Sequence, residues 1–171
     1  MGRSGYYPVF IQSYQDGIGH MINLTIYTDG SCNARTGFGG AGAYIIHAGG
    51  EAMISEGFLD TKTGRMEIMA VILALESIKP EKRLHCKIQI YSDSQYVVNS
   101  INKWLRNWVI MGLDGRTNGD LWKRYLAVAG SYTKGAIRIS WVRGHNGLEG
   151  NEIADSLANG AYKSGQYKPD R

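Results

Sequence analysis

The sequence predicts a single domain of the α/β class, with antiparallel strands first and later strands separated by helices. Three observations carry this prediction. Apolar and polar residues alternate with a two-residue period over Ile22–Tyr27, three short strand patterns follow one another closely, and a long apolar helix separates them from the next strand. At 171 residues the chain is long enough for one domain with a full hydrophobic core.

The first half is predicted to form an antiparallel meander. The opening strand begins at Ile22 and leads into Asp29 and Gly30, and a glycine-rich turn is expected over Cys32–Gly42. The spacing of that turn matches neither a dinucleotide-binding motif nor a P-loop. Strands over Ala43–His47 and Glu51–Phe58 follow, joined by a glycine turn.

The second half alternates helices and strands. The helix expected over Gly64–Lys79 is apolar nearly all round, which is typical of a helix buried on most sides. The next strand, Cys86–Asp93, can lie parallel to the first strand through a right-handed crossover. The remaining predicted elements are a helix over Tyr96–Trp108 with a break in its middle, a loop over 112–119, a helix over Asp120–Ala129, a strand over Ile137–Trp141 and a helix over Gly150–Lys163.

Residues 21–163 are expected to form the domain. Residues 1–20 carry no clear period and end in a junction that resembles a cloning scar, so we predict a tag or a disordered leader there. Residues 164–171 are expected to be a flexible tail. No apolar run approaches the roughly 18 residues that span a bilayer, and the two cysteines make neither a disulfide framework nor a zinc site. These features predict a cytoplasmic protein that does not bind membranes.

A basic and aromatic segment indicates an anionic partner. The chain carries a net charge of +4. Residues 103–124 contain five basic and two acidic residues and so supply +3 of it. Three tryptophans are interleaved with these charges: Trp104, Trp108 and Trp122. Aromatic residues among cations suit a nucleic-acid surface, although tryptophans at helical spacing are as often core residues.

Four acidic residues stand where they can converge. Asp29 and Asp93 end two strands about 4.8 Å apart, so their carboxylates repel each other unless a cation lies between them. Glu67 lies in the apolar helix and must face a cation or keep its proton. Asp155 lies on the last helix. Oxygen donors without a His or Cys cluster favour Mg²⁺ or Mn²⁺, and paired ions can activate water and stabilise the leaving oxygen of a phosphodiester.

Four blocks, in this order along residues 22–163, resemble the motifs of type 1 ribonuclease H (ribonuclease HI). They are Thr28-Asp29-Gly30-Ser31-Cys32, Arg65-Met66-Glu67-Ile68-Met69-Ala70, Ser92-Asp93-Ser94-Gln95-Tyr96-Val97, and Gly144-His145 with Asn151-Glu152, Asp155 and Leu157-Ala158. The resemblance implies an α/β ribonuclease H-like fold: a five-stranded mixed sheet, three antiparallel strands plus parallel strands, with helices on both faces. It also implies a metal-dependent endonuclease that hydrolyses the RNA strand of RNA/DNA hybrids, leaving 5′-phosphate and 3′-hydroxyl ends, as in RNA primer removal during DNA replication.

The resemblance assigns roles to single residues. Asp29, Glu67, Asp93 and Asp155 correspond to carboxylates that bind two Mg²⁺ ions, with Mn²⁺ as a substitute; Asp29 and Asp93 would be the central ligands, and Glu67 would also accept a ribose 2′-hydroxyl hydrogen bond. His145 matches a loop histidine that aids proton transfer or product release. The implied substrate contacts are Cys32, Asn33 and Gln95 on the RNA strand, Trp104 and Trp108 near the deoxyribose side, Asn118 on a DNA phosphate, and Thr63. The hybrid would be distinguished from DNA by its 2′-hydroxyls.

The chain departs from the family pattern at several positions. Thr63-Gly64 replaces a pair of asparagines, Lys62 replaces a phosphate-binding threonine, and Arg35 replaces an asparagine. In a shortened protrusion, Val109-Ile110-Met111 stands where many bacterial relatives are basic. Fewer phosphate contacts predict weaker and less salt-sensitive binding, and hence a higher KM.

Two alternatives stay open at this stage. An integrase- or resolvase-type polynucleotidyl transferase uses similar acids at similar strand ends, and a non-catalytic module could bind the hybrid without cleaving it. The helix carrying Glu67 directly after three strands, and the tryptophan-rich segment, favour the nuclease over the first alternative. Four clustered acids facing phosphates disfavour the second. We expect a monomer.

Overall fold

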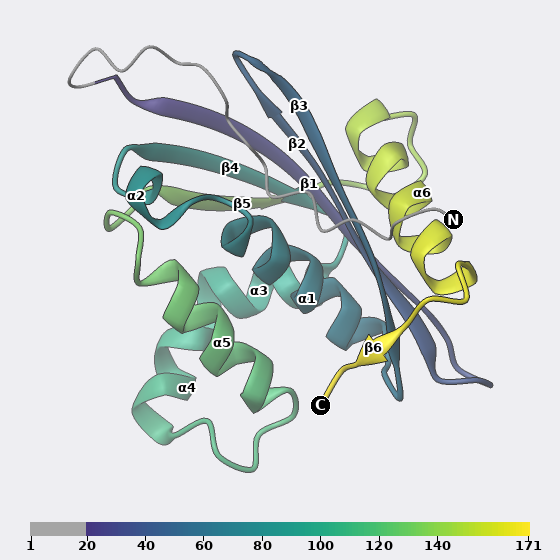
Figure 1. Cartoon of the computed structure of the whole chain (residues 1–171). Coiled ribbons are helices and arrows are strands. Elements are labelled where there is room, and N and C mark those ends of the chain that lie inside the picture. Colours follow the sequence, from purple (N-terminus) through teal and green to yellow (C-terminus); the bar gives the residue numbers. More distant parts are fainter. Residues whose placement is uncertain (1–19) are drawn as a thin grey trace.

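The computed structural model describes residues 20–171 and is built on one mixed sheet in the order β5-β4-β1-β2-β3-β6 (Figure 1). β1 (Ile22–Asn33), β2 (Phe38–His47) and β3 (Gly50–Leu59) form an antiparallel meander, and β4 (Cys86–Ser92) and β5 (Ile137–Trp141) add parallel strands beside β1. The predicted mixed α/β sheet is confirmed, with six strands where five were expected. The leader predicted for residues 1–20 lies outside the described residues, apart from His20.

The helices cover the sheet from both sides. Figure 1 shows α1 (Thr63–Glu76), α3 (Gln95–Asn99) and α5 (Gly119–Ala129) on one face and α6 (Glu149–Lys163) on the other. The break expected in the helix predicted over Tyr96–Trp108 is a π-helical turn over Ser100–Trp104, which is followed by α4 (Leu105–Met111). A short helix that we did not predict, α2 (Pro80–Arg83), precedes β4. Within residues 20–171, no helix combines the length and apolar character needed to cross a membrane.

The core lies between the sheet and α1. Leu24 and Ile26 of β1 are buried on this side, and ten of the fourteen residues of α1 are buried, as expected from its apolar sequence. Trp122 of α5 is fully buried in the same core, whereas Trp104 is exposed at the surface. The tryptophan-rich segment therefore contains both a core tryptophan and a surface tryptophan.

The glycine-rich segment after β1 is mostly strand, which corrects the turn predicted over Cys32–Gly42. β1 continues to Asn33, β2 begins at Phe38, and four residues form the turn between them. A Cβ added at Gly42 would lie 2.5 Å from the carbonyl oxygen of Ala154 in α6. The glycines of β2 are thus needed for the close packing of α6 on the sheet, and not for a change of chain direction.

Some C-terminal residues pack onto the domain, within the segment 164–171 that was expected to form a flexible tail. Lys168–Pro169 forms the sixth strand, β6, which pairs parallel with β3. The side chain of Asp170 is fully buried, and its carboxylate accepts a hydrogen bond of 2.5 Å from Nε of Arg65. Arg65 is itself buried and also donates to Asp120 at 2.6 Å and 3.0 Å.

Candidate active site

Two of the four predicted acids lie side by side at the carboxyl ends of neighbouring parallel strands. Thr28 of β1 pairs with Ser92 of β4, so Asp29 and Asp93, each one residue further on, are neighbours across the sheet. Asp29 is almost fully buried. Burial, followed by the negative charges of Asp93 and then Asp155, raises the pKa of Asp29 to about 8.

Glu67 joins them from α1 because Gly30 lets the helix approach β1. A Cβ added at Gly30 would overlap the backbone of Met66 and Glu67. The Glu67 carboxylate accepts a hydrogen bond of 2.6 Å from the hydroxyl of Ser94, the residue after Asp93. Burial raises the pKa of Glu67, and the negative charge of Asp93 adds to the increase, while the bond from Ser94 opposes it.

Asp155 comes from the opposite side, on α6. Its carboxylate accepts a hydrogen bond of 2.9 Å from the amide of Asn159, whose oxygen in turn accepts from the hydroxyl of Ser31 in β1 at 2.9 Å. This chain of bonds ties α6 to the strand that carries Asp29. The carboxyl groups of Asp29 and Asp155 lie within hydrogen-bonding reach of each other.

Asp93 is surrounded by groups from the last helix and from the loop before it. Burial raises its pKa, whereas a hydrogen bond from the side chain of Asn151 and the positive charge of His145 lower it. Asn151 is only 1% exposed, and its Oδ1 has no hydrogen-bond partner. The loop passes directly over Asp93, because a Cβ added at Gly144 would lie 2.6 Å from its Oδ2.

His145 itself is exposed in that loop and has a left-handed backbone, with φ of 51°. The structure therefore places the predicted histidine near Asp93 but on a segment that faces solvent. The four carboxylates and His145 converge on one end of the sheet.

Several residues that support the site were given no role in the sequence analysis. Asn151, Asp155 and Asn159 are spaced four residues apart on α6, so they share one face of that helix. This spacing could have revealed both asparagines. Ser94 gave no comparable signal, because its role depends on a glutamate 27 residues earlier in the chain.

The predicted substrate contacts lie around this end of the sheet, and their contact with substrate stays a prediction. Cys32 and Asn33 end β1, Thr63 begins α1 and Gln95 begins α3. Asn33 also holds the turn after β1, since its side-chain oxygen accepts from the backbone N–H groups of Arg35 and Thr36.

The remaining predicted contacts belong to the segment from α3 to α5. Asn118 precedes α5 with a left-handed backbone, donates to the hydroxyl of Tyr96 at 3.1 Å and accepts from Arg65. Trp104 and Trp108 form an aromatic row, with ring centroids 5.9 Å apart. The side chains predicted to contact the DNA strand are thus held in place by packing and hydrogen bonds.

The acids supply the oxygen donors that a hard divalent cation needs, but their side chains do not have the geometry of a metal site. Among residues 20–171, no three His, Cys, Asp or Glu side chains already have the geometry of a metal site. The raised pKa values of Asp29, Glu67 and Asp93 show a site in which negative charge is poorly compensated by the protein itself. The donor chemistry therefore fits a divalent cation that would enter and draw the carboxylates together.

Comparison with known proteins decides the family. The sequence model of the RNase H family matches residues 22–163, which span all four acidic residues. The chain belongs to the ribonuclease H family. Ribonuclease H of Francisella philomiragia is 42% identical over 144 residues, covering 81% of this chain and 90% of that protein. Ribonuclease H of Desulforamulus reducens is 38% identical over 150 residues, covering 84% and 90%.

Solved structures agree with this membership. LC9-RNase H1, described as a type 1 RNase H with the type 2 active-site motif, has a TM-score of 0.75 and 28% sequence identity, covering 85% of this chain and 74% of that one. An N-terminal RNase H domain from Mycobacterium tuberculosis, 20% identical with a TM-score of 0.65, shares the fold. The family's activity is hydrolysis of RNA in RNA/DNA hybrids, and its enzymes use divalent metal ions. The predicted family, fold class and activity are therefore confirmed.

Proposed function

We propose that the four converging carboxylates hold two Mg²⁺ ions, or Mn²⁺ in their place, and that the site cleaves the RNA strand to leave 5′-phosphate and 3′-hydroxyl ends. The proposal rests on one observation: four carboxylates from separate parts of the chain converge on one site, and no cationic side chain described in the structure neutralises them. They are Asp29, Glu67, Asp93 and Asp155. When bound, the ions supply an activated water and stabilise the leaving oxygen.

The residues of the chain have distinct tasks in this scheme. Asp29 and Asp93, fixed at the ends of neighbouring strands, provide the central oxygen donors. Glu67 is oriented by Ser94 and accepts a hydrogen bond from a ribose 2′-hydroxyl, which selects RNA over DNA at the cleaved position. His145 is exposed on its loop beside Asp93, where an imidazole can move a proton to or from the reacting phosphate.

Substrate binding is proposed to follow the predicted contacts. Cys32, Asn33, Gln95 and Thr63 surround the acids and face the RNA strand. The aromatic row of Trp104 and Trp108 faces the deoxyribose side, and Asn118 donates to a DNA phosphate. The bond from Asn118 to Tyr96 supports this last role because it fixes the amide before substrate binds.

The comparisons favour the hydrolase over the two alternatives. The integrase or resolvase reading shares only the fold, whereas the chain matches ribonucleases H along 81% to 84% of its length. A non-catalytic hybrid-binding module has no need for four acids facing phosphates. We further propose that the protein acts as a cytoplasmic monomer on RNA primers; the two free thiols, Cys32 and Cys86, are consistent with a reducing compartment.

A direct assay tests the proposal. A labelled RNA/DNA hybrid, duplex RNA and duplex DNA are each incubated with the full chain, with Mg²⁺, with Mn²⁺ and with a chelator. We expect cleavage of the hybrid alone, in the presence of metal alone, with 5′-phosphate and 3′-hydroxyl ends on the RNA fragments. Metal-independent cleavage, or cleavage of duplex DNA, contradicts the proposed site.

A further inference from the structure

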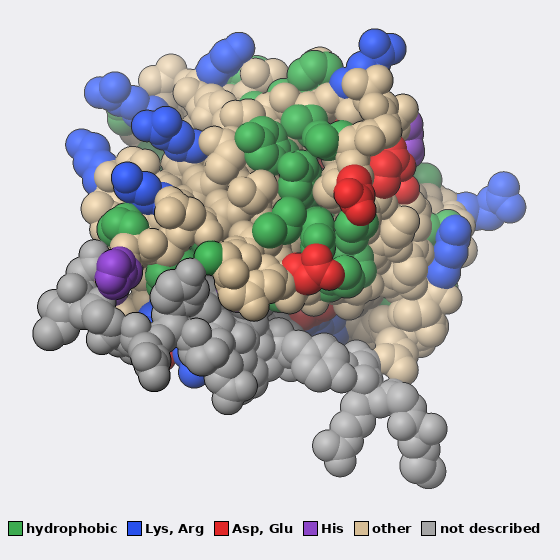
Figure 2. Space-filling view, turned by 90° about the horizontal axis from the view of Figure 1, so that it is seen from above, with side chains coloured by type: hydrophobic (Ala, Val, Ile, Leu, Met, Phe, Trp, Pro, Cys, Tyr) green, Lys and Arg blue, Asp and Glu red, His purple; other side chains and the backbone are tan. Residues whose placement is uncertain are grey.

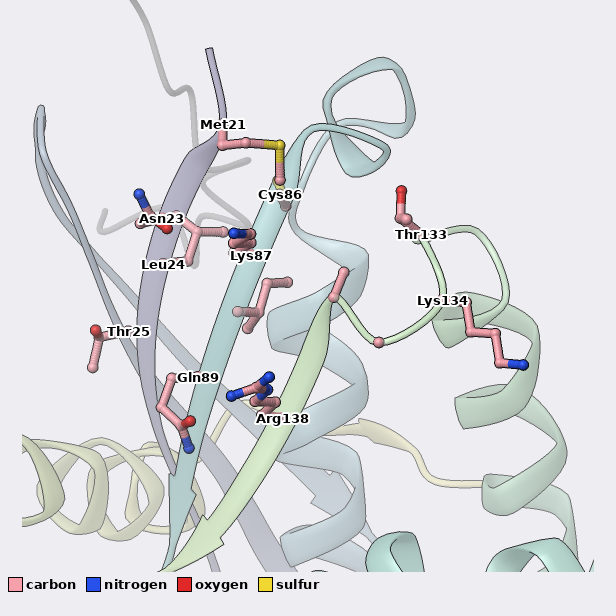
Figure 3. Close-up of a pocket in the computed structure, with 13 residues that line it drawn as sticks. Met21, Asn23, Leu24, Thr25, Cys86, Lys87, Gln89, Thr133, Lys134 and Arg138 are labelled. Atoms are coloured by element: carbon pink, nitrogen blue, oxygen red, sulfur yellow. The ribbon is translucent and has the colours of Figure 1, made fainter. Parts of the chain in front are cut away.

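A groove lies on the sheet at the end of the strands opposite to the catalytic acids. It has a volume of about 480 Å³ and is lined by the first residues of β1 and β4, by part of β5 and by the loop before β5. Figure 3 shows Gln89 and Arg138 side by side on β4 and β5, Lys87 nearer the start of β4, and Lys134 on the loop before β5 with its amino group directed away from the strands. None of the residues assigned to catalysis or substrate binding lines this groove.

The groove is strongly basic. Lys87, Lys134 and Arg138 line it, and no Asp or Glu is among the described residues of its lining. None of these three cations forms an ion pair with an acid of residues 20–171. Uncharged hydrogen-bonding side chains complete it: Asn23, Thr25 and Gln89. Such a lining is suited to an extended anion.

The strand register explains why the cations stay together. Gln89 pairs with Arg138 and with Thr25, so these three side chains form one row across β5, β4 and β1. Lys87, two residues before Gln89, is the diagonal neighbour of Arg138, at about 7–8 Å between the positions. Two like charges at that distance repel each other, and an anion bound between them would relieve the repulsion.

The side chains of Lys87, Gln89 and Arg138 lie on the same face of the sheet as that of Asp93. Side chains alternate along a strand, so Lys87, Gln89 and Tyr91 point to the same side as the acid that follows β4. Six residues separate Lys87 from Asp93, which is about 20 Å of strand, or about six stacked nucleotides. A strand of nucleic acid leaving the acids can therefore reach the groove.

Two partly exposed aromatic side chains lie between them. Tyr27 and Tyr91 are direct cross-strand neighbours whose rings stack with centroids 5.2 Å apart, whereas Tyr44, on the other side of Tyr27, is buried. Figure 2 looks onto the molecule from above Figure 1 and shows hydrophobic side chains in the middle of the view, lysines and arginines along its left side, and acidic side chains beside the hydrophobic ones. Cations that follow a phosphate backbone, next to aromatic side chains that contact bases, are the usual means of binding single strands.

We propose that this groove, lined by Lys87, Lys134 and Arg138, is an exosite for a single-stranded extension of the nucleic-acid substrate. The inference rests on the proposed function, because the extension is continuous with the hybrid held at the acids. Hybrids with an overhang of the correct strand and polarity then bind more tightly than blunt hybrids, through the phosphates of the overhang.

The test measures KM for blunt hybrids and for hybrids with overhangs of about 3 and about 10 nucleotides, placed in turn on each strand end. We expect one long overhang to lower KM by about threefold to tenfold and the short one to have no effect. The variant Lys87→Thr/Arg138→Thr, which keeps residues that favour strands, should lose this gain and retain the kcat of the wild type on blunt hybrid. Lys163→Ala/Arg171→Ala removes the same charge outside the groove and should keep the gain.

A second measurement separates this inference from the proposed function. Fluorescence anisotropy of a labelled single-stranded oligonucleotide should show binding that is weakened at least threefold in the groove variant and unchanged in Asp29→Asn. Competition by poly-glutamate as effective as that by the oligonucleotide would indicate an acidic polypeptide as the occupant and overturn the inference. An overhang effect that is absent, or that persists in the groove variant, also overturns it, whereas loss of all hybrid cleavage counts against the proposed function instead.

Discussion

Residues 20–171 contain two clusters of acidic side chains, and the clusters differ in how their charge is compensated. In the first, Asp120 and Asp170 meet the guanidinium of Arg65, which donates to both. In the second, Asp29, Glu67, Asp93 and Asp155 meet no buried cation, and His145 acts on Asp93 only from an exposed loop. The pKa of Asp120 is held below its usual value by the bond from Arg65, whereas the pKa values of three acids in the second cluster are raised.

This difference shows that the fold neutralises acids internally where they serve structure. The Arg65 cluster joins α1, α5 and the C-terminal strand, and its charges are compensated before any ligand arrives. The catalytic cluster is left short of positive charge, which disfavours its ionised form in the protein alone and favours entry of an external cation. The same chemical groups are therefore structural in one place and reactive in the other.

The largest effect is expected from Asp29→Asn. This change removes a central oxygen anion while keeping the side-chain volume, so hybrid cleavage should fall to background. Folding should not suffer, because the ionised carboxylate is unfavourable where it lies. The measurement is a single-turnover assay with Mg²⁺ together with urea unfolding. The matched variant Asp120→Asn removes a similar charge from the compensated cluster and should keep kcat while losing stability; near-normal cleavage by Asp29→Asn refutes the assignment.

The two variants should also differ in how stability depends on pH. Asp29 has a folded pKa of about 8 against an ordinary value of 3.8, so the folded state binds its proton more tightly. Its contribution to stability is present at low pH and is lost as pH rises towards 8. Asp120 has a lowered folded pKa, so its contribution is present above 3.8 and is lost in acid. In metal-free buffer, the stability of Asp29→Asn should fall less between pH 4 and 8 than that of the unmodified chain. The stability of Asp120→Asn should fall less only in acid.

The second prediction concerns Arg65. Replacing it with Ala leaves the fully buried Asp170 without its partner, and breaking a buried pair costs about 3–5 kcal/mol. Urea unfolding of Arg65→Ala should show a loss of this size. Arg65→Lys should recover only part of it, because an ammonium cannot donate to both carboxylates in the same fork. In a chain that already carries Asp170→Ala, the loss should be clearly smaller; an equal loss would mean that the two side chains are not coupled.

The clusters also show what could be predicted from the sequence. The alternation over Ile22–Tyr27 predicted the strand and the side on which Asp29 lies, and the motifs placed the other three acids. The turn predicted over Cys32–Gly42 was too long, because a glycine that lets a helix pack closely on a strand looks the same in the local sequence as a glycine that reverses the chain. Asp170 gave no signal, since its partner lies 105 residues away and no local pattern records such a pairing.

A smaller effect is expected from His145→Ala. The imidazole lies on an exposed loop beside Asp93, so it assists proton movement and does not hold the site together. Turnover should fall by about one to three orders of magnitude without reaching background. Steady-state kinetics over a range of pH measure the change, with His47→Ala as a control for loss of a histidine elsewhere. Activity at background would show that His145 is as indispensable to cleavage as the carboxylates of the catalytic cluster.

The smallest effect is expected in the protrusion, where basic side chains are again in contact with other groups of the protein. Lys123 pairs with Asp114, and the guanidinium of Arg116 packs 4.8 Å from the centroid of the Trp108 ring. The exposed tip of α4 is apolar, with Ile110 and Met111 each 77% exposed. The tip itself, Val109–Met111, has no cation to bind a phosphate, which leaves the exposed Lys103 and Arg106 earlier in the segment, so the KM for hybrid should rise only shallowly with salt. Ile110→Lys/Met111→Lys should lower KM at low salt and steepen the slope of log KM against log salt by up to about two. Ile110→Gln/Met111→Gln, which is polar but uncharged, should leave the slope unchanged; a steep slope in the unmodified chain, or equal slopes in both variants, would show that the phosphates are bound elsewhere.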